Sequence, residues 1–245
     1  MEQEPASLLG YRKNVYSQNG EDGVVGELVK RFELKTGWFC EFGAWDGQHG
    51  SNTFNLLRNG WRGVMIEGRP RRYRKLARTA AKYPDRLITR CAYVTSEPGP
   101  ESLDGLLSDT PIPTDFELLS IDIDGPDWHV WNSLTTYTPK IVIIEINSSY
   151  LPGVSAVHGE SQGSSFSATV ELGRRKGYQA VCHTGNLFFV RDDLVDRLGD
   201  AWASLDRDVD AVFLRDWTVR RSLGRRIRGK ARRAVQDAFS RSPAS

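Results

Sequence analysis

Short apolar runs that alternate with amphipathic segments are the feature of this chain that most restricts its fold. Runs such as WFCEF (38–42) and KIVIIEIN (140–147) are bounded by glycine, proline or polar residues and are too short for helices. Segments with apolar residues at helical spacing lie between these runs, among them a strongly basic one at 70–83. The alternation predicts an α/β domain built on a Rossmann-like, doubly wound and mostly parallel sheet of seven strands.

The end of the alternating region departs from the parallel pattern. Two strand-like runs lie close together within residues 178–190, with a short turn between them. They predict an antiparallel hairpin at one edge of the sheet. A chain of 245 residues suits one such domain with short extensions. We therefore divide it into an N-terminal helix or lid segment (1–36), a central domain (37–214) and a basic tail (215–245).

Charge is distributed unevenly along the chain. The whole sequence has a formal net charge of +2, yet residues 215–245 contain ten lysines and arginines and two acids. The tail is therefore strongly basic, and the rest of the chain is mildly acidic. Apolar residues recur every four positions in the tail, which predicts an amphipathic helix with arginines on its other faces.

Three roles are open for this tail: it packs against the domain, lies on an anionic membrane surface, or binds phosphate groups. Gly224 and Gly229 weaken the helix, and its apolar stripe has one large aromatic residue, Phe239, so at most weak membrane contact is expected. Nucleic-acid binding is not expected, because only Trp217 and Phe239 offer aromatic rings near the arginines. The simplest expectation is a solvated helix.

The location of the protein is predicted from its composition. The first residues, MEQEPASLLGYRKN, contain no basic region followed by an apolar run, and no stretch of the chain is long and apolar enough to span a membrane. Cys40, Cys91 and Cys182 are far apart and lie in or beside apolar runs, which predicts three buried thiols. We expect a cytoplasmic protein, peripheral at the inner membrane face where the tail binds lipid.

A glycine-rich bend follows the first strand-like run. Gly43, Gly47 and Gly50 in EFGAWDGQHG allow the backbone to pass close to a ligand with its amide groups directed inward. Glu41 ends the run before the bend, and Glu67 ends the next run 26 residues later. In open α/β sheets, ligands bind beyond the carboxyl ends of the strands, and an acid after the second strand holds ribose hydroxyls. These features predict a nucleoside cofactor.

The spacing of the glycines discriminates between cofactors. A dinucleotide fingerprint needs a glycine where this chain has Trp45, and no P-loop sequence is present. EFGAWDG instead resembles motif I, acid-x-Gly-x-x-x-Gly, of class I S-adenosylmethionine (SAM)-dependent methyltransferases. The ordered set YSQNGED, EFGAWDG, SNT, GWRGVMIEG, SIDIDGPDW, KIVIIEIN and GNLFFVR is similar to the FkbM-type branch of that family or a close relative. Many members of this branch methylate hydroxyls of sugars or natural products.

The resemblance implies how the cofactor is held. Residues 37–214 would be the methyltransferase domain, with SAM between the ends of the first two strands and its adenine beside Cys91 and Ala92. YSQNGED, at residues 16–22, is either a lid over the site or a simple helix cap. The residues that the resemblance places around SAM are Glu41, Gly43, Ala44, Asp46, Gly47, Glu67, Cys91, Ala92 and Asp122.

Acids also end two later runs that should be neighbouring strands. Side chains alternate along a strand, so Asp122 and Asp124 share one side, as do Glu145 and Asn147. Methyl transfer needs an electron-rich acceptor oxygen, which a base or a cation provides, so Asp122, Asp124 and Glu145 are catalytic candidates. Some class I O-methyltransferases place Mg²⁺ here, and the similarity implies Asp122, Asp124, Glu145 and Asn147 as its ligands. The alternative is that the acids cap the following helices.

His158 is the preferred histidine for a general base, since it follows the fifth strand-like run in a loop that can reach the cleft. The sequence thus predicts SAM-dependent methyl transfer to a hydroxyl of a sugar, glycan or glycosylated metabolite. A NAD(P)- or nucleotide-sugar-binding Rossmann oxidoreductase is the rival enzyme, disfavoured by Trp45 and by the lack of a Tyr-x-x-x-Lys pair. A nucleic-acid-binding module that uses the arginine-rich tail is the alternative outside the enzymes.

Overall fold

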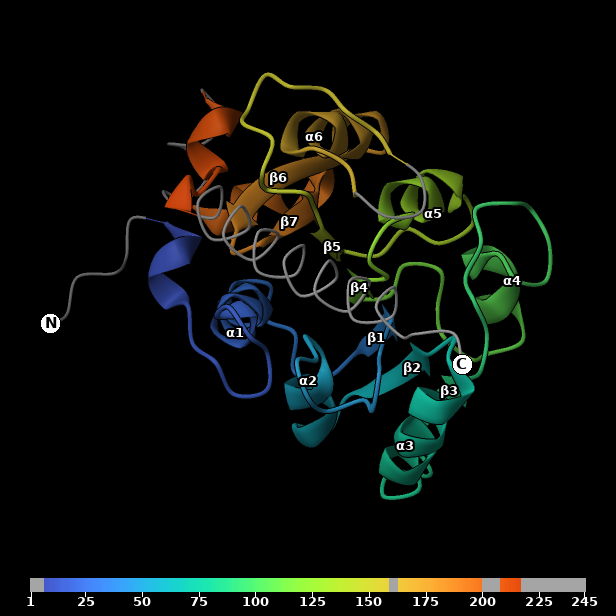
Figure 1. Ribbon diagram of the computed structural model, residues 1–245. Coiled ribbons are helices and arrows are strands. Elements are labelled where there is room, and N and C mark those ends of the chain that lie inside the picture. Colours follow the sequence, from blue (N-terminus) through green and yellow to red (C-terminus); the bar gives the residue numbers. More distant parts are fainter. Residues whose placement is uncertain (1–6, 159–162, 200–207, 217–245) are drawn as a thin grey trace, which may run out of the picture.

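The computed structural model describes residues 7–158, 163–199 and 208–216, and these residues contain one seven-stranded sheet (Figure 1). The strand order is β3-β2-β1-β4-β5-β7-β6. β7 is antiparallel to both of its neighbours, and the other neighbouring pairs are parallel. This arrangement confirms the predicted doubly wound sheet with an antiparallel hairpin at one edge. The strands are β1 (Trp38–Phe42), β2 (Arg62–Ile66), β3 (Leu87–Arg90), β4 (Leu118–Ile121), β5 (Ile141–Glu145), β6 (Tyr178–His183) and β7 (Asn186–Arg191).

Helices cover both faces of this sheet. In Figure 1, α1, α2 and α3 lie on one side of it, and α4, α5 and α6 lie on the other. The α-helices are α1 (Glu21–Arg31), α2 (Phe54–Arg58), α3 (Pro70–Ala80), α4 (Leu103–Ser108), α5 (Asp127–Ser133) and α6 (Phe166–Arg175). Three 3₁₀ helices are described as well: η1 (Leu8–Tyr11), η2 (Asp192–Leu198) and η3 (Val209–Val212).

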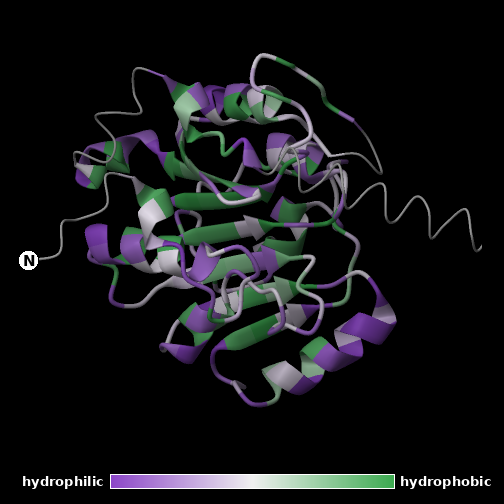
Figure 2. Ribbon diagram, turned by 60° about the vertical axis from the view of Figure 1, so that its left-hand side comes forward, coloured by the Kyte–Doolittle hydropathy of each residue, from purple (hydrophilic) through white to green (hydrophobic). Residues whose placement is uncertain are grey.

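The strand side chains alternate between two hydrophobic clusters, one on each face of the sheet. Phe39 and Met65 pack with the α1 and α2 side chains, whereas Phe42 and Ile66 pack with those of α5 and α6. Figure 2 shows the same layering, with mainly hydrophobic strands between helices that carry hydrophilic stretches. Burial on both faces explains why the strand sequences are nearly continuous apolar runs instead of alternating ones.

The two ends of the chain relate differently to this domain. Val24, Val25 and Leu28 of α1 are buried in the hydrophobic cluster on their face, so the described part of the leading segment packs against the sheet. The predicted basic helix of the tail falls almost entirely on residues outside the described ranges and stays a prediction. Within the described ranges, no helix combines the length and the hydropathy that crossing a bilayer requires.

The three cysteines are free, but they are not all buried as predicted. Cys40 and Cys182 lie in the core, where burial raises the pKa of the Cys182 thiol to about 12. Cys91 is exposed, because β3 ends at Arg90 and the chain leaves the sheet there.

A buried histidine attaches the last described segment to the sheet. The Leu214 backbone N–H donates to His183 Nδ1 (3.0 Å), so the neutral ring carries its proton on Nε2, which lies 3.0 Å from Ser148 Oγ. Phe213 stacks on the ring, with centroids 4.8 Å apart. Burial lowers the pKa of His183 to about 4. This histidine is therefore a structural group and not a base in the cleft.

The depressed pKa of His183 predicts a loss of stability in mild acid. Because the unfolded chain binds a proton near pH 6.5 and the folded protein resists it, the free energy of unfolding should fall between about pH 6.5 and pH 4, by roughly 3 kcal/mol in total. Urea unfolding at several pH values measures this loss. His183→Gln should flatten the dependence in that interval, and parallel curves for the two proteins would contradict the assignment.

Candidate active site

A cleft of about 800 Å³ opens at the carboxyl ends of the parallel strands. The segments that follow β1, β2, β3, β4 and β5 contribute to its walls, together with residues just before α1 and in the β6–β7 turn. This is the edge where ligands bind in open α/β sheets. Its walls include Gln18, Asn19, Glu21, Glu41, Gly43, Ala44, Trp45, His49, Glu67, Arg69, Arg72, Ala92, Tyr93, Asp122, Asp124, Glu145 and Asn186.

The loop after β1 begins with a turn that only glycine fits. Gly43 has a φ of +79°, and a Cβ built on it would lie 1.7 Å from the backbone oxygen of Asp122. The N–H groups of Gly43 and Ala44 both donate to the Ile66 carbonyl at 3.1 Å. The loop therefore runs between the ends of β2 and β4, with its backbone at the cleft surface.

Trp45 is a non-glycine residue with left-handed backbone geometry, with a φ of +49°. Its side chain is 41% exposed at the cleft, and the Arg72 guanidinium lies 5.4 Å from the centre of the ring. Its backbone N–H donates to Glu67 Oε2 at 3.0 Å. Such strained positions persist where the surroundings enforce them, and they concentrate at binding sites.

Glu67 presents a fixed carboxylate just after β2. The side chain is 4% exposed and lines the cleft. Besides the bond from Trp45, the backbone N–H of Arg69 donates to Oε1 at 2.7 Å. A carboxylate oxygen accepts more than one hydrogen bond, so both oxygens are oriented and retain capacity for ligand hydroxyls.

Glu41 is the other predicted cofactor acid, and hydrogen bonds from the segment just before α2 fix its carboxylate. Its carboxylate accepts hydrogen bonds from Ser51 Oγ (2.6 Å), the Asn52 backbone N–H (3.1 Å) and the Thr53 hydroxyl. Burial raises the pKa of Glu41, and these hydrogen bonds oppose that effect. Glu41 borders the cleft, but its bonds fix the turn that leads into α2.

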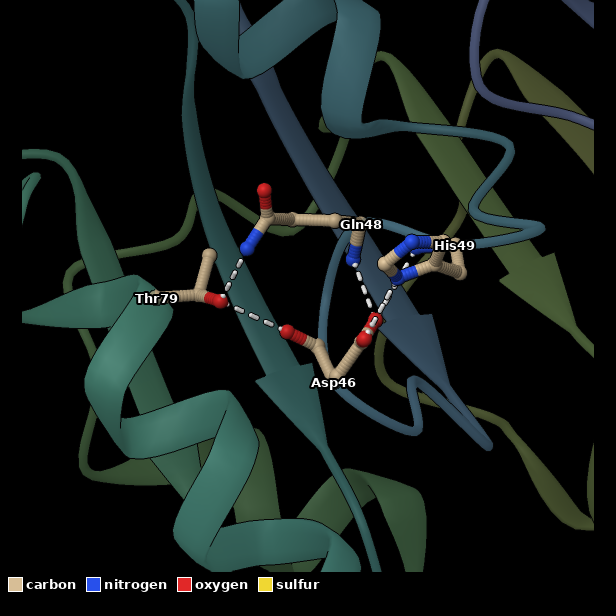
Figure 3. A network of polar contacts seen from close by, with 4 residues as sticks. All are labelled: Asp46, Gln48, His49 and Thr79. Carbon is tan, nitrogen blue, oxygen red and sulfur yellow. Dashed lines mark hydrogen bonds and ion pairs between the residues drawn. The ribbon is translucent and has the colours of Figure 1, made fainter.

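Asp46 and Gly47, two of the predicted cofactor contacts, are not among the residues that line the cleft. Figure 3 shows the contacts that hold Asp46 within its own loop and against Thr79. Asp46 accepts hydrogen bonds from the Gln48 and His49 backbone N–H groups and lies 2.6 Å from His49 Nδ1. Thr79 of α3 donates to the Asp46 carbonyl and accepts from the Gln48 amide, both at 2.7 Å. Burial would raise the pKa of Asp46, but the bonds from His49 and Gln48 lower it overall.

The loop after β3 supplies one predicted residue and one that sequence reasoning missed. Ala92 lines the cleft, whereas Cys91 is exposed and is not among the residues that line it. Tyr93 lines the cleft with a 64% exposed side chain, and its ring lies against the backbone of Gly68. The available signal was an aromatic residue three positions after β3 ends, at the edge of the sheet where ligands bind.

Three carboxylates meet on the opposite wall, as predicted. Oxygens of Asp122, Asp124 and Glu145 all lie within 4.8 Å of one another. The parallel pairing of β4 with β5 aligns Ile121 with Ile144 and so brings the residues that follow into register. Asp124 has a φ of +62°, the second strained position at the cleft.

Asn147, which was predicted as a fourth ligand, bonds within the turn after β5. It is fully buried, is not among the residues that line the cleft, and its Oδ1 accepts from the backbone N–H (3.2 Å) and the hydroxyl of Ser149. The amide oxygen thus folds the turn after β5. The three carboxylates form a group that could hold a cation.

His158 is also placed differently from the prediction. Its Nε2 lies 2.9 Å from the Tyr150 hydroxyl, and the two rings stack with centroids 5.8 Å apart. This pairing keeps His158 within its own loop, and it is not among the residues that line the cleft. Among the four histidines, all of which are described, only His49 lines it, paired with Asp46.

The leading segment closes the remaining side of the cleft. Glu21 is 1% exposed, and it accepts hydrogen bonds from the Thr184 hydroxyl (2.8 Å) and the Asn186 amide (3.4 Å) of the β6–β7 hairpin. Asp22 Oδ2 accepts from the backbone N–H groups of residues 15, 16 and 17. Residues 15–22 are therefore tied both to themselves and to the hairpin.

Comparisons with known proteins give structural resemblances alone. No protein-family model matches the chain, and no curated protein matches it significantly in sequence. A SAM-dependent methyltransferase from Clostridium acetobutylicum ATCC 824 is 7% identical with a TM-score of 0.47, covering 73% of this chain and 93% of that one. TrmK of M. capricolum in complex with S-adenosylhomocysteine is 9% identical with a TM-score of 0.42, covering 67% of this chain and 66% of that one. The small RNA methyltransferase HEN1 is 13% identical with a TM-score of 0.46, covering 74% of this chain and 26% of that one.

Proposed function

We propose that this protein is a SAM-dependent methyltransferase that transfers a methyl group to a hydroxyl of a sugar, glycan or glycosylated metabolite. The observation that carries the proposal is the arrangement of one cleft. A glycine loop and a fixed acid, Glu67, form one wall, and a cluster of three carboxylates forms the other. The proposal also draws on the resemblance of EFGAWDG and the later motifs to class I methyltransferases.

The first wall fits the nucleoside part of the cofactor. Glu67 has two oriented oxygens for the two ribose hydroxyls, and the backbone at Gly43 and Ala44 gives close access to the ligand. Ala92 and Tyr93 offer a flat apolar surface for the adenine. SAM bound here would supply an electrophilic methyl group on its sulfonium.

The second wall fits activation of the acceptor. Glu145 or Asp122 would take the proton from the acceptor hydroxyl as its oxygen bonds to the methyl carbon and the sulfur–methyl bond of SAM breaks, which would leave S-adenosylhomocysteine. The carboxylate cluster also suits a hard cation such as Mg²⁺, which would lower the pKa of that hydroxyl. In both versions, these side chains would orient the acceptor oxygen in line with the methyl group.

A thermal shift measurement tests the proposal before any acceptor is known. S-adenosylhomocysteine at about 100 times its Kd should stabilise the folded protein by about 2.7 kcal/mol, which raises the Tm by roughly 5–10 °C. NAD is the control ligand and should give no shift, because Trp45 stands where a dinucleotide site needs glycine. A shift with NAD alone would favour the rival oxidoreductase and reject the proposal.

A further inference from the structure

Exposed apolar side chains occur in the loops at the edge of the sheet where the cleft opens, and two of them, Trp45 and Tyr93, line the cleft itself. In the part of the chain that the structure describes, six large hydrophobic residues are exposed, with exposed fractions of 39–64%. They belong to the segments before α1 and after β1, β3 and β5. We call this set the apolar rim: Val15, Trp45, Tyr93, Leu151, Val154 and Val157.

The fold explains why these residues share one edge. β1, β3 and β5 run in the same direction within the sheet, so the loops that follow them all emerge at the carboxyl edge. The segment of Val15 joins them there, because the Gly50 N–H donates to the Tyr16 carbonyl at 2.9 Å. Single exposed apolar residues are common anywhere on a protein surface, whereas several in the loops of one sheet edge are typical of an interaction surface.

A strongly basic surface adjoins the rim. Between residues 69 and 82 there are seven lysines and arginines and no acid, and none of the seven forms an ion pair with another described residue. Arg69 and Arg72 line the cleft itself, and Arg72 lies over Trp45. We call this set the basic face: Arg69, Arg71, Arg72, Arg74, Lys75, Arg78 and Lys82.

The start of α3 is unfavourable for so much positive charge. Pro70 is the first residue of the helix, and Arg71 and Arg72 occupy its first turn, where acidic residues normally complement the helix dipole. Cations at this position repel the dipole and one another. A dense array of negative groups outside the protein would relieve that repulsion.

The two surfaces together discriminate between polyanions. A nucleic acid would use the cations and the two aromatic rings, but it offers nothing to Leu151, Val154 and Val157. An anionic bilayer can contact both surfaces. Its headgroup phosphates would pair with the basic face, its interface would accommodate Trp45 and Tyr93, and its acyl chains would contact the aliphatic residues of the apolar rim.

We propose that the apolar rim and the basic face dock the mouth of the cleft onto an anionic membrane surface. The acceptor would then be an amphiphile whose hydroxyl-bearing head enters the cleft from the bilayer. This statement about the acceptor rests on the proposed methyltransferase function, whereas the docking itself does not.

Vesicle co-sedimentation of the full chain tests the docking. The protein should bind vesicles of phosphatidylcholine with phosphatidylserine and not those of phosphatidylcholine alone. Val154→Asp with Val157→Asp, and separately Arg71→Glu with Arg74→Glu, should each weaken binding by about tenfold or more. Neither pair lines the cleft. The matched control is Lys30→Glu with Arg62→Glu, at the far end of α1 and the start of β2, which should keep most of the binding.

Three outcomes would overturn the docking proposal. Vesicle binding that neither the valine variant nor the arginine variant changes would place any membrane contact elsewhere in the chain. Preferential binding of poly(U), lost in the arginine variant and kept in the valine variant, would indicate a nucleic acid. Light scattering that shows a dimer dissociated by the valine variant would mean that the rim contacts a second copy. The thermal shift with S-adenosylhomocysteine should persist in both variants, so failure of docking and failure of the proposed function are distinguishable.

Discussion

Replacing Gly43 with alanine is expected to destabilise the protein by about 3 kcal/mol or more and to abolish binding of S-adenosylhomocysteine. The added Cβ would lie 1.7 Å from the Asp122 carbonyl oxygen, and the φ of +79° is itself unfavourable for alanine. Neither backbone can withdraw easily, because the Asp122 N–H donates to the Phe42 carbonyl and the Gly43 N–H donates to that of Ile66. Urea unfolding measures the loss.

Gly26→Ala is the matched control for this change. Gly26 lies within α1, and no heavy atom is within 4 Å of the position its Cβ would take. Alanine there should stabilise the protein by about 0.5–1 kcal/mol, since it favours the helix. If Gly43→Ala retained the stability of the original protein and its thermal shift, the close approach of these three strand ends would not be what shapes the cleft.

The arrangement of the strands and the carboxylate cluster could be predicted because both depend on local patterns. Buried parallel strands require continuous apolar runs, and parallel neighbours place their carboxyl ends at one edge. Asp122 and Glu145 follow such runs directly, so their convergence required only that β4 and β5 pair. Glu67 follows β2 in the same way.

The structure differs from the sequence expectation where a side chain bonds within its own loop instead of lining the cleft. Asp46 bonds to Gln48 and His49, and its carbonyl bonds to Thr79, which is 33 residues away. The sequence spacing shows only that Asp46 lies in the bend. His158 likewise pairs with Tyr150 inside the loop after β5.

Other contributors were missed because they depend on strand direction. Gly185 and Asn186 line the cleft from the turn between β6 and β7. That turn reaches the carboxyl edge because β7 is antiparallel to β5, so β6 ends at the same edge as β5. A hairpin pattern in the sequence does not specify the edge at which its turn lies.

Neutralising Glu145 as Glu145→Gln is expected to slow methyl transfer by about 100- to 10,000-fold, the range that a positioned base contributes. Labelled methyl passing from SAM into a cell extract measures the rate. The substitution keeps the shape of the side chain, so the thermal shift with S-adenosylhomocysteine should remain. Asp115→Asn is the matched control, because Asp115 is an exposed acid just before β4, at the opposite edge of the sheet, and its loss should leave the rate unchanged.

A chelator distinguishes two possible causes of this loss of rate: a lost cation and a lost base. If Glu145 acts by holding a cation with Asp122 and Asp124, EDTA should reduce the original protein to the rate of Glu145→Gln and should not slow the variant further. If Glu145 removes the proton directly, EDTA should leave the original protein active. A variant as fast as the original protein would contradict both versions, because each requires the charge of this carboxylate beside the acceptor oxygen.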